Sequence, residues 1–113
     1  MLKSVLTPGQ ETPEVDVTEA ARAWATGAAQ IVDVREPDEW AAGHIPDAVH
    51  IPHGELPTRT GELDPARPVI TVCRSGRRSL AAADVLIAAE FPDAASLAGG
   101  MLAWDYAKQP VAG

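Results

Sequence analysis

The chain has 113 residues, the size of one ordinary domain, and a formal net charge of -7 at neutral pH. This acidic balance disfavours binding to nucleic acids and to anionic membranes. No apolar run reaches the length of a membrane span, and the first residues lack the pattern of a secretory signal peptide. One cysteine, Cys73, permits neither an intramolecular disulfide nor a cysteine-based zinc site. We therefore expect a cytoplasmic protein with no membrane or nucleic-acid partner.

The N-terminal region combines a loose segment with the first helix. Residues 1–13 carry two prolines and little periodicity, so we interpret them as a lead-in to a domain over residues 14–111. Residues 15–17 alternate in polarity and could form a short edge strand. Thr18 is then the expected N-cap of a helix with an acidic first turn, and Gly27 is expected to end that helix.

The remainder of the chain alternates between strand-like and helix-like segments. Short runs predict strands at 31–34, 48–51, 69–72 and, more weakly, 94–97. Helices are expected from 36 to the stop at Gly43, briefly around 54–57, and over 79–90 and 101–108. This alternation predicts an α/β fold with a mainly parallel central sheet flanked by helices on both faces.

The location of Cys73 indicates where the chemistry should lie. Cys73 ends the most strand-like run, and ligands of parallel sheets bind beyond the carboxyl ends of the strands. An arginine-rich loop follows, and three of the nine basic residues fall within positions 74–78. Cations and a helix N-terminus both stabilise a thiolate, which is the nucleophilic form of cysteine. The sequence therefore predicts a small anion-binding site around a reactive thiol.

Four stretches, in this order, resemble the single-domain rhodanese family of thiosulfate sulfurtransferase-like proteins. They are Val32-Asp33-Val34-Arg35-Glu36 with Trp40, Gly43-His44-Ile45-Pro46-Asp47-Ala48, Cys73-Arg74-Ser75-Gly76-Arg77-Arg78-Ser79, and Leu97-Ala98-Gly99-Gly100-Met101-Leu102-Ala103-Trp104. The resemblance covers roughly residues 14–111. Asp47 and Ala98 depart from the family, which usually has glycine and an acidic residue at those positions.

The resemblance implies a transfer of sulfane sulfur in two steps. The Cys73 thiolate takes sulfur from an anionic donor such as thiosulfate, becomes a persulfide, and passes the sulfur to an acceptor. The loop would form the anion cradle through its backbone amides and arginines: Arg74, Ser75, Gly76, Arg77, Arg78 and Ser79. Arg78 matches the arginine that closes the family's loop, so we favour it over Arg77 for donor binding. Because the chain has no second cysteine, the acceptor must be external: cyanide, a thiol or a protein.

Other polar residues are expected to support this site, and no cofactor is implied. Asp33 can accept hydrogen bonds from loop amides, Arg35 can pair with a carboxylate and line the pocket, and His44 can fix its turn. His50 and His53 are three residues apart but have no third ligand nearby, so we expect no metal site.

Several alternatives remain open. The chain could be a persulfide relay that serves a protein partner with little turnover of free thiosulfate, or a non-catalytic interaction domain. Cys73 could also be an inert buried cysteine. Cysteine phosphatases have a related cradle, with one more residue than the four that separate Cys73 from Arg78. The shorter loop encloses a sulfur atom rather than a phosphate group, which disfavours phosphatase activity.

Overall fold

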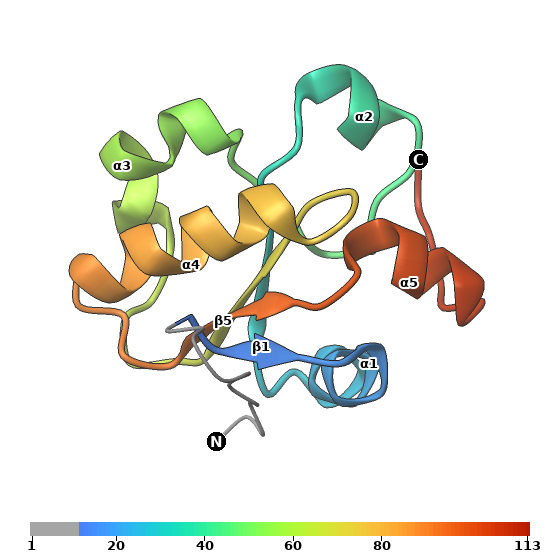
Figure 1. Ribbon diagram of the computed structural model, residues 1–113, viewed down its shortest axis with the longest axis horizontal. Coiled ribbons are helices and arrows are strands. Elements are labelled where there is room, and N and C mark those ends of the chain that lie inside the picture. The colour runs from blue at the N-terminus through green and yellow to red at the C-terminus, as the bar shows by residue number, and fades with distance from the viewer. Residues whose placement is uncertain (1–11) are drawn as a thin grey trace.

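A five-stranded sheet forms the centre of the computed structural model, which describes residues 12–113 (Figure 1). The predicted lead-in, residues 1–13, lies almost entirely outside the described residues. The strand order is β1-β5-β4-β2-β3, and every registered pair is parallel. The carboxyl ends of the strands therefore meet at one edge of the sheet. The strands are β1 Glu14–Val15, β2 Gln30–Asp33, β3 Val49–His50, β4 Val69–Val72 and β5 Ala94–Leu97.

Helices cover both faces of the sheet, as the alternating pattern predicted. In Figure 1, α3 and α4 lie on the opposite side of the strands from α1, and the core residues place α5 with α1. The helices are α1 Val17–Thr26, α2 Pro37–Ala41, α3 Leu56–Arg59, α4 Arg77–Ala88 and α5 Gly100–Tyr106, with 3-10 turns η1 His53–Glu55 and η2 Thr60–Glu62.

The sheet separates two apolar layers. The first lies between the sheet and the helices α1 and α5 and contains the fully buried Trp104. The second lies under α3 and α4 and includes Leu86 and Cys73. All four residues of β4 are buried, as expected for a central parallel strand covered on both faces. Cys73 therefore directly follows a strand that is buried along its whole length.

The helix starts differ from the sequence predictions. The N-cap of α1 is Asp16, whose carboxylate accepts a hydrogen bond from the Glu19 amide at 2.8 Å, so the assignment to Thr18 was wrong. Asp16 follows β1 directly, and its extended backbone leaves its carboxylate facing the first helical amides. Gly27 ends α1 in the left-handed conformation, which confirms the predicted stop. The helix expected to begin at 79 begins at Arg77 instead.

The backbone conformation of Asp47 explains why this residue can stand where the family usually has glycine. Its φ is +67°, a left-handed conformation that glycine adopts most easily. Aspartate is one of the few other residues that tolerate this region, because its short polar side chain can bond locally. Aspartate can therefore occupy this turn position, where the family usually has glycine.

Candidate functional site

Cys73 is held at the carboxyl end of β4 by the loop that follows it. The backbone N–H of Gly76 donates a hydrogen bond to the Cys73 Sγ at 3.1 Å. The Cys73 thiol donates to Ser79 Oγ at 3.3 Å, and Ser79 Oγ shares a second hydrogen bond with Ser96 Oγ at 2.7 Å. Both serines are fully buried, and Cys73 is 1% exposed. The loop thus curls around the sulfur and places it at the base of a backbone cradle.

Glycine is required at the centre of this cradle. Gly76 has a φ of +102° and is the N-cap of α4, so the chain turns there directly into the helix. A Cβ at this position would lie 3.1 Å from the backbone nitrogen of Gly99. The left-handed backbone and the close approach of a second loop therefore both favour glycine.

The surroundings of Cys73 act on its thiol in opposing directions. Burial disfavours the thiolate and raises the pKa. Hydrogen bonds from Ser79, Gly76 and Ser75 favour the thiolate, and together they outweigh burial, so the pKa of the Cys73 thiol is lowered from its ordinary value. In the thiolate state the Ser79 hydroxyl can turn to donate to Sγ, while Ser96 donates to Ser79 Oγ. The site therefore favours a nucleophilic sulfur without a neighbouring general base.

The start of α5 supports the loop from behind. The Met101 amide donates to the Cys73 carbonyl at 2.8 Å, and the Leu102 amide donates to the Arg74 carbonyl at 3.0 Å. A Cβ on Gly100 would overlap the Cys73 carbonyl oxygen and lie 2.6 Å from the Arg74 carbonyl oxygen. Only glycine allows this approach, so the Gly99-Gly100 pair is part of the site. Sequence reasoning missed this role of Gly100 and that of Ser96.

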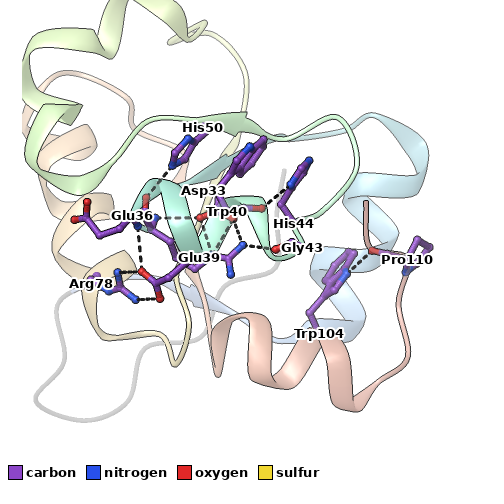
Figure 2. A network of polar contacts seen from close by, with 11 residues as sticks. Asp33, Glu36, Glu39, Trp40, Gly43, His44, His50, Arg78, Trp104 and Pro110 are labelled. Carbon is purple, nitrogen blue, oxygen red and sulfur yellow. Dashed lines mark hydrogen bonds and ion pairs between the residues drawn. The ribbon is translucent and has the colours of Figure 1, made fainter. Parts of the chain in front are cut away.

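The three loop arginines differ in their surroundings. Arg74 and Arg77 are exposed, and their guanidinium groups form no ion pair or hydrogen bond with any residue in 12–113. Arg78 instead donates two hydrogen bonds to the Glu39 carboxylate, at 2.7 and 2.9 Å (Figure 2). The unpaired cationic groups of the loop are thus Arg74 and Arg77, although the sequence favoured Arg78 over Arg77 for donor binding. That preference remains a prediction.

Asp33 and Arg35 form a buried ion pair at the end of β2, next to β4. The Arg35 side chain donates to both Asp33 carboxylate oxygens, at distances of 2.7 to 3.1 Å, and the Arg35 amide donates to Asp33 Oδ1. Arg35 also donates to the Gly43 carbonyl at 2.7 Å (Figure 2). Each partner is less than a tenth exposed. The pair therefore ties the end of β2 to the turn after α2.

His44 and His50 flank the indole of Trp40. Their rings stack on it with centroid distances of 3.5 and 4.7 Å. Nδ1 of His44 donates to the Trp40 carbonyl, and Nε2 of His50 donates to the Arg35 carbonyl, because a carbonyl oxygen only accepts (Figure 2). Trp40, which belongs to the first of the four stretches that resemble the family, is half-buried. Within residues 12–113 no three His, Cys, Asp or Glu side chains are grouped as a metal site would require.

Together these features define an α/β protein with a buried cysteine, enclosed by the loop that follows it, at the carboxyl edge of a parallel sheet. The family model of the rhodanese-like domain matches residues 16–107. The chain therefore belongs to the rhodanese-like domain family. No helix in the described part of the chain is long and apolar enough to cross a membrane.

Two relatives match most of the chain. The YtwF protein of Bacillus subtilis (strain 168) is 39% identical over 71% of this chain and 77% of its own length. A sulfurtransferase of Allochromatium vinosum is 40% identical over 66% of this chain and 69% of its own. At these identities and coverages, both relatives belong to the same family as this chain.

Solved structures agree with the fold. The rhodanese-like domain of an Anabaena protein has a TM-score of 0.82 at 26% identity and covers 91% of this chain and 80% of that one. A thiosulfate sulfurtransferase of Pseudomonas aeruginosa has a TM-score of 0.81 at 32% identity, with 93% of this chain matching 21% of the larger protein. The fold prediction is confirmed, and the family includes sulfurtransferases.

Proposed function

We propose that this protein is a sulfurtransferase that moves sulfane sulfur from an anionic donor, such as thiosulfate, to an external acceptor through a persulfide on Cys73. The observation that carries the proposal is the cradle itself. Cys73 Sγ accepts a backbone hydrogen bond from Gly76, contacts the Ser79 hydroxyl, and has a lowered thiol pKa. The thiosulfate sulfurtransferase among the structural neighbours supports the choice of donor.

The first half-reaction forms one S–S bond and breaks another. The Cys73 thiolate attacks the outer sulfur of thiosulfate, and the electron pair of the broken S–S bond leaves with sulfite. The enzyme then carries a persulfide anion, so the total charge is unchanged. In the second half-reaction a nucleophile such as cyanide attacks the outer sulfur, forms thiocyanate, and restores the thiolate. No proton transfer to the protein is needed in either step.

Each part of the loop has a role in this scheme. The Gly76 amide and the Ser79 hydroxyl stabilise negative sulfur, first on the thiolate and then on the persulfide. The exposed Arg74 and Arg77 attract the donor anion to the loop. α5 holds the loop carbonyls, so the amides keep their inward orientation without reorganisation during the reaction.

Steady-state turnover tests the proposal. The wild-type protein should convert thiosulfate and cyanide into sulfite and thiocyanate, measured as the coloured iron complex of thiocyanate. Cys73→Ser should show no turnover, because serine cannot form a persulfide. Turnover by Cys73→Ser equal to that of the wild type would overturn the mechanism.

A persulfide relay that serves a protein partner is the second candidate, and the single cysteine is compatible with it. With no second thiol in the chain, sulfur on Cys73 can leave only to another molecule. A relay would accept one sulfur per chain rapidly and turn over slowly with cyanide. A single-turnover burst followed by a negligible steady state would therefore select the relay over the enzyme.

A cytoplasmic location is also part of the proposal. The chemistry needs Cys73 as a free thiol, and reducing compartments keep thiols free. Fractionation of cells that express the protein would test the location.

A further inference from the structure

Glu39 links the active loop to a separate helix. It lies on α2, and its carboxylate accepts two hydrogen bonds from Arg78, 39 residues further along the chain, at 2.7 and 2.9 Å. The same carboxylate accepts the Glu36 amide at 3.1 Å as part of the capping box of α2. Two elements therefore fix the carboxylate in one position. The Glu39 carboxylate is therefore held more rigidly than the carboxylate of an isolated surface ion pair usually is.

The pair changes the charge that the loop presents to a ligand. Hydrogen bonds from Arg78 lower the pKa of Glu39 to about 2 against the effect of partial burial, so the carboxylate is ionised at neutral pH. The carboxylate of Glu39 in turn raises the pKa of Arg78, and the negative charge of Cys73 acts in the same direction. Arg78 lies in the first turn of α4, five residues after Cys73, and its positive charge is compensated by Glu39. Arg74 and Arg77 have no such carboxylate partner in the described part of the chain.

We propose that Glu39 is a positioning and specificity-determining residue that fixes the Arg78 guanidinium and weakens the attraction of the loop for anions. This inference rests on the proposed function and deepens it. A loop with three uncompensated arginines would bind a dianionic donor more tightly, but it would also retain the sulfite product. Because Glu39 compensates the charge of Arg78, the two exposed arginines attract the donor. The loop then holds the sulfite product less tightly, so that the product leaves more easily.

Alkylation of Cys73 with two reagents of different charge tests the role of Glu39 directly. Iodoacetate is an anion and iodoacetamide is neutral, and both react with the same thiolate. The ratio of their rate constants therefore cancels the thiolate fraction and reports the local potential. Glu39→Gln keeps the size of the side chain but removes its charge, so this ratio should rise about twofold to fivefold at low salt. The rise should diminish in high salt, because ions screen the interaction.

Three further variants separate charge from structure. Glu39→Asp retains the charge in a shorter side chain and should keep the wild-type ratio. Arg78→Gln leaves the Glu39 charge uncompensated, so the ratio should fall below that of the wild type. Glu62→Gln is a matched control, because Glu62 pairs with Arg59 through two contacts in the same way, but on an exposed surface and with no hydrogen bond or ion pair to the loop after Cys73 within residues 12–113. It should leave the ratio unchanged.

The same variants distinguish this inference from the proposed function. Glu39→Gln should also lower the KM for thiosulfate without raising kcat, since tighter anion binding does not accelerate the chemical step. An unchanged or reduced alkylation ratio in folded Glu39→Gln would overturn the role of Glu39, whatever happens to its melting temperature. Lack of thiosulfate turnover by the wild type, with the ratio rising as expected, would count against the proposed function alone.

Discussion

The hydroxyl of Ser79 should set much of the reactivity of Cys73. Ser79→Ala removes the hydroxyl group that contacts Sγ at 3.3 Å and leaves the backbone amide of Gly76 in place. Hydrogen bonds to charged groups are worth about 1.5–3 kcal/mol. Loss of this one should therefore raise the pKa of Cys73 in Ser79→Ala and slow its alkylation at neutral pH by about tenfold to a hundredfold. The direction follows because the lost group stabilised the thiolate more than the thiol.

The assay is the pH dependence of the alkylation rate with iodoacetamide, with Cys73→Ser as the blank. The midpoint of the curve should move to higher pH in Ser79→Ala. Ser96→Ala removes only the hydroxyl behind Ser79, at 2.7 Å, and should move the midpoint in the same direction by less. An unchanged or lower midpoint in a folded Ser79→Ala variant would refute this account of thiolate stabilisation. Near-ultraviolet circular dichroism and thermal melting would establish that the variant is folded.

Three further predictions concern the support of the loop, acid stability and oxidation. Gly100→Ala should destabilise the fold by about 2–4 kcal/mol in urea unfolding, because its Cβ would meet the Cys73 carbonyl and its φ is +55°. A loss below about 0.5 kcal/mol would contradict the close approach. Glu39 has its pKa lowered from 4.5 to about 2, so its contribution to stability is present above pH 4.5 and is lost as the pH falls towards 2; urea unfolding across this range should show a smaller acid loss in Glu39→Gln than in the wild type. Hydrogen peroxide should inactivate the protein when no thiol is added, because Cys73 has no resolving cysteine in the chain; undiminished turnover would argue against a reactive thiolate.

The cysteine loop could be predicted because its information is local. The strand, the cysteine, the glycine and the arginines are contiguous, so their order alone indicates a thiol followed by a turn into a helix. β4 was also clear, since four apolar or β-branched residues in a row indicate a strand buried on both faces. The sheet pattern followed from the alternation of elements.

The partners of the loop could not be predicted in the same way. Ser96 reaches Ser79 because β5 lies beside β4 in the sheet, and Gly100 reaches Cys73 because α5 begins where β5 ends. Both approaches depend on the strand order, which the local pattern does not specify. The Glu39 contact to Arg78 likewise depends on how α2 lies relative to α4.

The helix cap at Asp16 shows a limit of a different kind. Asp16 and Thr18 are both good N-cap residues, and they are only two positions apart. The choice is made by where the extended backbone of β1 ends, because the cap must precede the first helical residue, Val17. The N-cap preferences of single residues therefore indicated that a helix begins here, but they did not identify its first residue.

The most direct test of the central claim is the intact mass of the protein after brief incubation with thiosulfate. The account predicts a gain of one sulfur atom, about 32 Da, that cyanide removes and that is absent in Cys73→Ser. An unchanged mass in a wild-type protein whose Cys73 still reacts with iodoacetamide would contradict persulfide formation from thiosulfate.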